Sequence, residues 1–175
     1  MAVSKEEFRK TLGRFATGVT VITVAAGDER VHGMTANAFT AVSLEPLLVL
    51  VCIDHRARTH PLVQARKRFG VNVLGEGQQA LADYYARADQ DHETAHRLGA
   101  RYWYTERGTP LLEGCLARLE CRVVSVYEEG DHTIFIGAVE HVDGRDGRPL
   151  LFYAGRYRRL ERGVPPDPLG PRGVP

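Results

Sequence analysis

The sequence has few cysteines, no long apolar run and almost no net charge. Its three cysteines (Cys52, Cys115 and Cys121) include no Cys-x-x-Cys pair and are too few for a disulfide framework, so we expect a protein of the reducing cytoplasm. No run of about 18 apolar residues is present, and the N-terminal residues lack an apolar signal-peptide core, so we expect neither a membrane span nor a secretory signal. The formal net charge of +1 argues against nucleic acid as the main partner.

Lysine is also scarce. Of the 23 basic residues, only Lys5, Lys10 and Lys67 are lysines, and the rest are arginines. We attribute most of this bias to a GC-rich genome. Because arginine presents a planar fork that suits phosphates and carboxylates, we expect any phosphate site in this chain to be built from arginine.

The length and composition fit one globular domain. The chain has 175 residues, of which 43% are hydrophobic and 26% are charged. A domain of this size buries about 70% of the surface that its unfolded chain exposes. A separate nucleotide-binding domain beside a catalytic domain does not fit this length. Residues 161–175 hold five of the nine prolines, so we expect a domain over 1–160 and a disordered or surface-draped tail.

Short β-branched and apolar runs between turn signals predict a mainly β protein. Ser4 and Glu7 have capping-box spacing, which predicts an N-terminal helix. Further helices are predicted over 59–68, with Thr59 as the cap, and over 78–88. Strands are expected over 19–24, 32–44 (with a loop), 47–53, 69–74, 116–127, 132–141 and 149–153. Six or seven short strands with helical insertions indicate an antiparallel β-barrel.

The segment His92–His96 matches the zinc motif H-E-x-x-H. On a helix, His92 and His96 would share one face and hold zinc, with Glu93 as the base. The flanking residues are polar, so we expect the segment to be solvated all round, whereas a metal-binding helix packs against an apolar wall. Tyr102 stands where the longer motif has a third histidine. We therefore expect no metal site, and a zinc hydrolase is kept as a remote alternative.

Residues 75–80 match the pattern G-x-G-x-x-A between an expected strand and an expected helix. The dinucleotide fingerprint also requires a second parallel strand that ends in an acidic residue about 20 residues further on. A polar stretch lies there instead, so we interpret the glycines as a helix entry. Cys115 and Cys121 are expected to be buried as small hydrophobic residues.

A more specific signal comes from several motifs taken together. The chain resembles the short-chain flavin reductase family, the NAD(P)H:flavin oxidoreductases that serve two-component monooxygenases, from about Phe8 to Leu160. The segments that carry the resemblance, in the family's order and spacing, are Phe15–Thr23, His32–Phe39, Val42–Pro46, Leu48–Cys52, Phe69–Leu74, Gly130–His132, Pro149–Tyr153 and Gly155–Tyr157. Two departures are a single proline, at Pro46, where the family often has two, and Ala57 where it commonly has serine.

The resemblance implies an FMN-binding split β-barrel of Greek-key, antiparallel topology, which agrees with the strand-rich pattern. It also implies a homodimer that holds FMN or FAD near the dimer interface, with NADH or NADPH as the hydride donor. The expected activity is the transfer of a hydride from NAD(P)H to flavin. The expected partner is a flavin-dependent monooxygenase that receives the reduced flavin.

The residues Thr35, Ala36 and Asn37 are small enough for their backbone amides to approach a flat ring closely, where N–H groups can stabilise negative charge. By the resemblance, Met34 to Asn37 line the isoalloxazine. The flavin phosphate needs positive charge and donors, which Arg56, Arg58 and the Thr59 hydroxyl at an expected helix N-terminus supply. The resemblance places the ribityl and phosphate contacts in the segment of Cys52, Asp54, Arg56, Arg58 and Thr59, with Ser43 as a further candidate.

Three further residues are expected around the flavin. In the family, the histidine of the Gly-Asp-His motif, His132 here, faces the nicotinamide side of the flavin. Hydride transfer needs no general base, so we expect His132 to be positional. Tyr157, with Arg156, is expected to close the nicotinamide or the adenine side by stacking and hydrogen bonding.

Other functions are consistent with the same sequence. A flavin-binding barrel without turnover, acting as a carrier or sensor, would keep the fold and the cofactor. The barrel of the pyridoxamine-phosphate oxidases is similar, but the Gly-Asp-His and Gly-Arg-Tyr segments favour the reductase.

Overall fold

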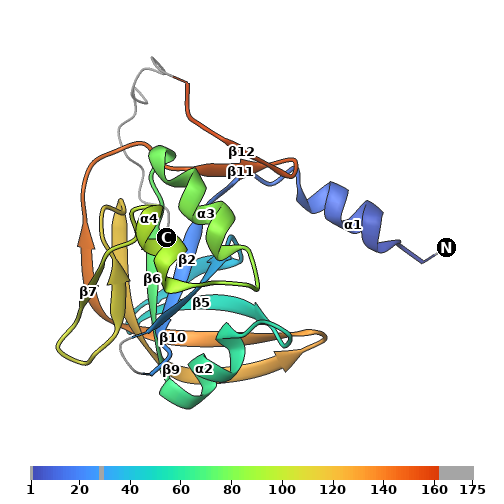
Figure 1. The fold of residues 1–175 in the computed structure, drawn as a ribbon. Coiled ribbons are helices and arrows are strands. Elements are labelled where there is room, and N and C mark those ends of the chain that lie inside the picture. The colour runs from blue at the N-terminus through green and yellow to red at the C-terminus, as the bar shows by residue number, and fades with distance from the viewer. Residues whose placement is uncertain (1, 28–29, 162–175) are drawn as a thin grey trace.

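A computed structural model describes residues 2–27 and 30–161 of the chain. The expected tail over 161–175 therefore falls almost entirely outside the described residues. Figure 1 shows a strand-rich body with helices packed on its outside and one helix, α1, that projects away from it. The elements in chain order are α1 (Lys5–Leu12), β1 (Thr17–Gly18), β2 (Thr20–Ala25), β3 (Val31–Ala36), β4 (Phe39–Leu44), β5 (Leu47–Asp54), α2 (Thr59–Arg66), β6 (Arg68–Val73), a 3-10 turn (Glu76–Gln78), α3 (Gln79–Tyr85), α4 (His92–Arg97), β7 (Tyr102–Tyr104), β8 (Pro110–Leu112), β9 (Ala117–Glu129), β10 (His132–Gly144), β11 (Leu151–Tyr153) and β12 (Arg156–Arg158).

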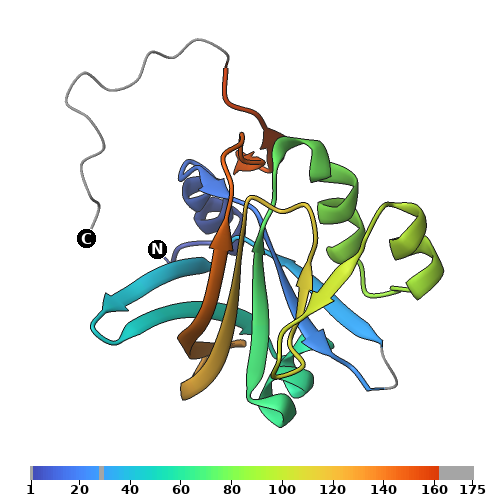
Figure 2. The same cartoon turned by 90° about the vertical axis from the view of Figure 1, so that its left-hand side faces the viewer.

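Seven of the described strands form a sheet that curls into a split barrel, whereas β1, β11 and β12 form a second sheet and β7 and β8 a third. The order of the barrel sheet is β3-β2-β6-β9-β10-β5-β4, and every neighbouring pair is antiparallel. The two outermost strands, β3 and β4, are separated by only two residues, Asn37 and Ala38. Because so short a link cannot span an open sheet, the two ends of the sheet must lie close together. Figure 2 shows the long β9–β10 hairpin beside β6, with the β4–β5 hairpin projecting to one side. The predicted antiparallel barrel is confirmed.

Strand β2 is buried on both faces, which explains its continuous β-branched sequence. Ile22 and Val24 face the barrel interior and pack with Phe69, Phe135 and their neighbours. Val21 faces the other way, into a second apolar cluster beneath α3 and α4. This second cluster fixes α3 and α4 against the outer face of the barrel.

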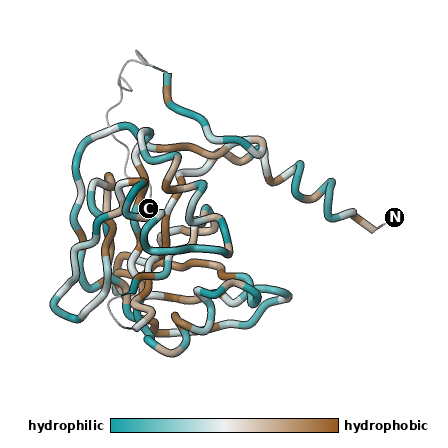
Figure 3. The backbone as a smooth tube through the Cα atoms, viewed as in Figure 1, coloured by the Kyte–Doolittle hydropathy of each residue, from teal (hydrophilic) through white to brown (hydrophobic). Residues whose placement is uncertain are grey.

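The N-terminal helix forms as its capping box predicts. Ser4 accepts a hydrogen bond from the Glu7 backbone N–H, and the Glu7 carboxylate accepts one from the Ser4 N–H. The apolar side chains of this helix and its exit remain exposed: Phe8 is 58%, Leu12 56% and Phe15 76% exposed. Figure 3 shows this segment reaching beyond the body of the molecule. No described helix is long and apolar enough to span a membrane.

The buried carboxylate of Glu120 connects β9 with β6 and with the segment between β7 and β8. Glu120, on β9, is 1% exposed and accepts hydrogen bonds from the hydroxyls of Thr105 (3.0 Å) and Thr109 (2.7 Å). Arg68, on β6, donates to the same carboxylate at 3.1 Å and also pairs with Glu140 on β10 at 2.8 Å. The segment between β7 and β8 is thereby held against the outer face of the sheet.

Candidate functional site

The free edge of β3 forms the floor of the candidate site. Gln90 covers part of this edge, because its amide accepts from the Gly33 N–H (3.3 Å) and donates to the Gly33 carbonyl (2.8 Å). Backbone groups on an edge strand alternate in direction, so those of Thr35, two residues on, also point away from β2. The Thr35 hydroxyl donates to the Ala82 carbonyl at 2.7 Å, which anchors β3 to α3. The edge at Thr35 therefore presents a backbone donor and a backbone acceptor to the outside.

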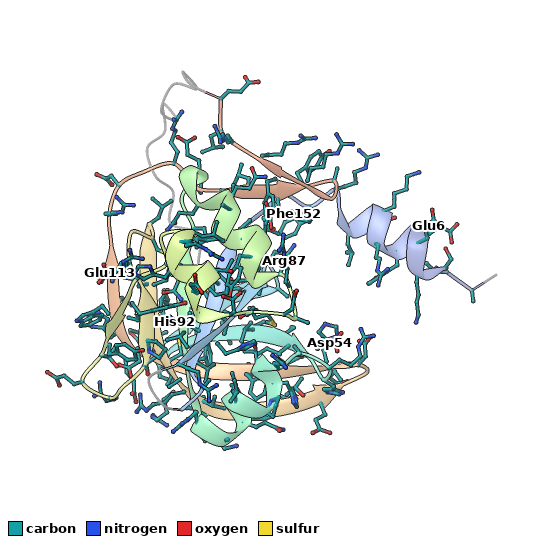
Figure 4. The ribbon with its side chains drawn as sticks, in the orientation of Figure 1. Glu6, Asp54, Arg87, His92, Glu113 and Phe152 are labelled. Atoms are coloured by element: carbon teal, nitrogen blue, oxygen red, sulfur yellow. The ribbon has the colours of Figure 1, made fainter. Side chains whose placement is uncertain are left out.

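Two adjoining cavities follow this edge. The first has a volume of about 240 Å³ and the second about 260 Å³, and both are lined by Thr35 and Ala86. The first is also lined by His32, Gly33, Met34, Arg56, Ala57, Arg58, Thr59, Tyr85, Arg87, Ala88 and Gln90. The second is also lined by Val19, Ala36, Asn37, Phe152 and Tyr157. In Figure 4, Arg87 lies between Phe152 above and Asp54 below.

The loop from β5 into α2 brings arginines to the first cavity. Asp54 holds Arg56 through two side-chain bonds, from Nε at 3.1 Å and from Nη2 at 2.7 Å, and also accepts from the Arg56 backbone N–H at 2.8 Å. These Arg56 hydrogen bonds hold the pKa of Asp54 well below its usual range. The side chain of Arg56 is nevertheless 86% exposed. Arg58 makes one long contact, from Nη1 to the Ala88 carbonyl at 3.5 Å.

The predicted role of Thr59 as a helix cap is wrong. The residue before the helix is Arg58, which already has helical dihedral angles (φ −57°, ψ −27°) instead of the extended ones typical of a cap, and its side chain makes no capping hydrogen bond. A turn in which Ala57 N–H donates to the Asp54 carbonyl and His60 N–H donates to the Ala57 carbonyl causes this early entry. Thr59 becomes the first helical residue and is fully buried. Its hydroxyl has no hydrogen-bond partner among the described residues.

On its other side, the loop is held by Thr133, whose hydroxyl contacts two histidine rings. The ring nitrogens Nε2 of His55 and His60 lie 3.0 Å and 2.8 Å from the hydroxyl oxygen of Thr133, which is fully buried on β10. The two imidazole rings meet edge to face at 5.1 Å. Since Thr133 follows His132, this cluster also links the loop to the start of β10.

The structure brings together many, but not all, of the residues predicted from the sequence. The predicted residues that line the two cavities are Met34, Thr35, Ala36, Asn37, Arg56, Arg58, Thr59 and Tyr157. Cys52, Asp54, Arg156 and His132 do not line them, although His132 pairs in register with Asp54 beside the loop. The His132 ring is 43% exposed, and its Nδ1 lies 2.7 Å from Asp131. Ser43 lies further along β4, where its hydroxyl accepts from the Glu45 N–H at 3.2 Å.

The cavities are also lined by four residues that were not predicted from the sequence: Tyr85, Arg87, Gln90 and Phe152. Tyr85 carried a signal, because it falls on the apolar side of the predicted helix over 78–88. Gln90 lies in a polar stretch without periodicity, and only the tertiary fold shows that its amide pairs with Gly33.

The two motifs set aside in the sequence have structural explanations. The H-E-x-x-H segment forms α4, but the expectation that it is solvated all round is wrong, because Ala95 is buried against the second apolar cluster while His92 and His96 are exposed. Within the described ranges, no group of three or more His, Cys, Asp or Glu side chains is placed to hold a metal ion.

The glycines of residues 75–80 enter a 3-10 turn after β6, which is antiparallel to both of its neighbours, so a dinucleotide fingerprint does not apply. Cys115 and Cys121 are buried, as predicted.

Comparison with known proteins decides the family. A family model described as a flavin reductase like domain matches residues 12–161. The chain belongs to this flavin reductase family. It is 44% identical over 161 residues to an NADH-dependent flavin reductase of Rhodococcus, covering 91% of this chain and 88% of that one. It is 39% identical over 157 residues to the reductase component of a 4-hydroxyphenylacetate 3-monooxygenase of Thermus thermophilus, covering 89% and 97%.

Solved structures of flavin reductases share the fold. The NADH:FAD oxidoreductase of Streptomyces globisporus C-1027, in complex with NAD and FAD fragments, superposes with a TM-score of 0.82 at 38% identity, over 94% of this chain and 99% of that one. The flavin reductase of a styrene monooxygenase from Pseudomonas putida S12 superposes with a TM-score of 0.80 at 34% identity, over 90% and 99%. The resemblance and the split-barrel fold that the sequence predicts are therefore confirmed.

Proposed function

We propose that this protein transfers a hydride from NADH to FMN or FAD and releases the reduced flavin to a partner monooxygenase. The names of the Rhodococcus and Thermus relatives support this activity and this kind of partner. The observation that carries the proposal is the pair of cavities along the open edge of β3, with a buried hydroxyl at one end that has no hydrogen-bond partner in the described part of the chain. Both features fit a flat ring with a phosphate attached.

The first cavity fits the flavin phosphate. The Thr59 hydroxyl is a donor without a partner among the described residues, at the first residue of an eight-residue helix whose N-terminus favours anions. Arg58 adds positive charge at the same cavity, and Arg56 can add more if its bond to Asp54 is shared with the ligand. Arginine supplies the charge, as the composition leads us to expect.

The edge of β3 and the second cavity fit the isoalloxazine ring. The outward N–H of Thr35 can donate to the ring, and the small side chain of Ala36 lets the ring approach the strand. Asn37 and Tyr157 form the remaining walls, with Phe152 packed edge to face against Tyr157 at 5.6 Å. A bound flavin supplies the hydride-accepting chemistry, and the protein contributes binding, orientation and electrostatics. Backbone donors aimed at the ring stabilise the negative charge that develops on reduction.

We assign His132 a positional role on the nicotinamide side. Its ring is half exposed beside Asp131 at the end of β10 where the Asp54–Arg56 pair lies. In that position it can contact an incoming nicotinamide nucleotide without taking part in proton transfer, with Arg156 as a further contact. The expected effect of His132→Ala is a higher KM for NADH with little change in flavin affinity. His96→Ala, an exposed histidine outside both cavities, is the matched control.

A homodimer is part of the proposal. The exposed apolar side chains of α1 and its exit (Phe8, Leu12 and Phe15) extend from the body and need a cover, which a second copy of the chain can provide. We place the protein in the cytoplasm, because Cys52, Cys115 and Cys121 are all free thiols.

The decisive experiment is to mix the purified protein with NADH and free FMN or FAD and follow the loss of NADH absorbance. We expect oxidation well above the rate without enzyme, for at least one of the two flavins. Tight flavin binding with no NADH oxidation would instead support a flavin carrier or sensor and would overturn the reductase proposal.

A further inference from the structure

The segment that supplies the proposed phosphate contacts is attached at both ends to a single side chain. Residues 56–59, which include both arginines and the buried threonine of this cavity, lie between His55 and His60 along the chain. The Nε2 atoms of the two histidines lie 3.0 Å and 2.8 Å from the hydroxyl oxygen of Thr133 on β10. These two contacts close the segment into a loop whose ends meet at one atom of the barrel.

Thr133 is a firm anchor for this loop. Its side chain is fully buried, and its strand is paired on both sides, with Thr133 in register with Ile53 on β5 and with Glu128 on β9. The imidazole of His60 also meets the fully buried ring of Phe135, two residues further along β10, edge to face at 5.7 Å. The anchor therefore belongs to the core of the barrel, whereas most of the loop is exposed.

The hydroxyl of Thr133 can satisfy both histidines at once. A threonine hydroxyl has one proton to donate and two lone pairs that accept, and a neutral imidazole has one donor and one acceptor nitrogen. Thr133 can therefore donate to the Nε2 of one histidine while it accepts from the Nε2–H of the other. Burial, followed by the charge of His55, lowers the pKa of His60, against a smaller opposite effect of Glu128, so the His60 ring is neutral at neutral pH. Removing the hydroxyl would leave both rings without their common partner.

The arginines of the segment are otherwise weakly held. The side chain of Arg56 is 86% exposed, and its carboxylate partner, Asp54, stands at the start of the same loop. The Arg58 guanidinium is held by a long hydrogen bond of 3.5 Å, and α2 begins without a side-chain cap. Since ordering a surface segment costs conformational entropy, arginines on a loosely held segment must lose freedom when they bind an anion. A segment that is already attached at both ends avoids much of that cost.

We propose that Thr133 is a positioning residue, which acts through His55 and His60 to hold the arginine segment in the form that binds the flavin phosphate. This inference rests on the proposed function, because it requires a phosphorylated flavin in the cavity that Arg56 and Arg58 line. Thr133 lines neither of the two flavin cavities, so it acts only through the histidines. Riboflavin, which has no phosphate, should not depend on this contact.

The test compares Thr133→Val, which keeps the shape of the side chain and loses the hydroxyl, with Thr133→Ser, which keeps the hydroxyl. Affinities for FMN and riboflavin are measured by titrating the fluorescence of the flavin. A hydrogen bond between neutral groups corresponds to about a twofold to tenfold change in an equilibrium constant, so we expect Thr133→Val to weaken FMN about fivefold to tenfold. Riboflavin should bind as it does to the native protein, and Thr133→Ser should restore most of the FMN affinity.

Thr23→Val is the matched control. Thr23 is also fully buried, and its hydroxyl has two partners outside the segment, the Pro110 carbonyl and the Asn72 amide. This variant should lower the free energy of unfolding and leave the ratio of the FMN and riboflavin affinities unchanged. Native FMN affinity in Thr133→Val would overturn the proposal, as would equal losses for FMN and riboflavin. A higher KM for NADH with unchanged FMN affinity would assign the hydroxyl to the neighbouring His132 and would also overturn it.

His55→Ala tests the same contact from the exposed side, where the substitution does not disturb the core. The His55 N–H still donates to the Asp131 carbonyl at 3.1 Å in this variant, so we expect a smaller loss, of about twofold to fivefold for FMN and none for riboflavin. His96→Ala, at another exposed histidine, should change neither affinity. Adding His55→Ala to Thr133→Val should cause no further loss, because both changes remove the same hydrogen bond. Native FMN affinity in His55→Ala, or additive losses in the double variant, would contradict the proposal.

Hydrogen exchange separates this inference from the proposed function. In the flavin-free protein, the amides of residues 55–60 should exchange faster in Thr133→Val than in the native protein, and this measurement needs no flavin. Unchanged exchange would show that Thr133 does not hold the segment. A native protein that binds neither FMN nor riboflavin would instead refute the proposed function.

Discussion

Replacing Thr59 with valine should stabilise the flavin-free protein and weaken the binding of phosphorylated flavins. Both effects come from the Thr59 hydroxyl, which lowers stability when it is left without a partner and strengthens binding when a phosphate accepts its hydrogen bond. The Thr59 hydroxyl is fully buried and lacks a hydrogen-bond partner among the described residues. An unsatisfied buried polar group costs about 1–3 kcal/mol, and valine has nearly the same shape without that group. The free energy of unfolding without flavin should therefore rise by about 1 kcal/mol.

The loss of flavin affinity follows from the same hydroxyl. A hydrogen bond to a charged group contributes about 1.5–3 kcal/mol, which corresponds to about a tenfold to a hundredfold change in Kd. The affinity for FMN should fall by this factor in Thr59→Val, whereas riboflavin, which has no phosphate, should bind as it does to the native protein. Urea unfolding followed by circular dichroism measures the first effect, and flavin fluorescence titration measures the second.

A matched control is Thr23→Val, at another fully buried threonine. Its hydroxyl donates to the Pro110 carbonyl at 2.5 Å and accepts from the Asn72 amide at 3.0 Å, so its loss should destabilise the protein. If Thr59→Val destabilises the flavin-free protein as Thr23→Val does, the hydroxyl has a structural partner and the reasoning is wrong. Equal weakening of riboflavin and FMN would refute the phosphate contact itself.

Further predictions concern Glu120, Gly33 and the cysteines. Glu120→Ala should lower the free energy of unfolding by about 3 kcal/mol in urea, because it leaves buried hydroxyls and an arginine without their shared carboxylate. Gly33→Ala would place a methyl group 2.5 Å from a buried tyrosine ring, so the flavin affinity and the free energy of unfolding should both fall, as measured by calorimetry. Gly18→Ala is the control, because Gly18 has open space around it and the substitution should change neither quantity. A thiol reagent should label the half-buried Cys52 in the native protein but label Cys121 only after unfolding. Burial raises the pKa of Cys121 to about 12, so its contribution to stability should be lost as the pH rises above the ordinary thiol value of 9.0, measured as a falling Tm.

The sequence predicted the barrel well because its strands carry strong local signals. The β-branched run of β2, the apolar run of β5 and the β9–β10 hairpin with its Gly130 turn each identify a strand without reference to the rest of the chain. The stretch 89–108 could not be assigned, since α4 and β7 are short and are held by tertiary contacts such as the burial of Ala95. Local pattern cannot reveal an element whose stability comes from packing.

Only some residues of the candidate site could be predicted from the sequence, for a related reason. Residues within a single motif, such as Met34 to Asn37, can be assigned from that motif alone. Gln90 contributes through its pairing with Gly33, which is 57 positions away. The error at Thr59 has the same origin, because the preceding turn, and not the residue type, determines where the helix begins.

The open edge of β3 links the fold to the proposed function. The outer edge of β3 has no partner among the described strands, and an unpaired edge is a site for association with other chains. Gln90 satisfies the edge at Gly33, but the backbone groups of Thr35 still face outward. A flavin ring laid against this position would satisfy them. The flavin-free protein should therefore be the form in which this edge is least protected, and hydrogen exchange at the Thr35 amide should slow when flavin binds.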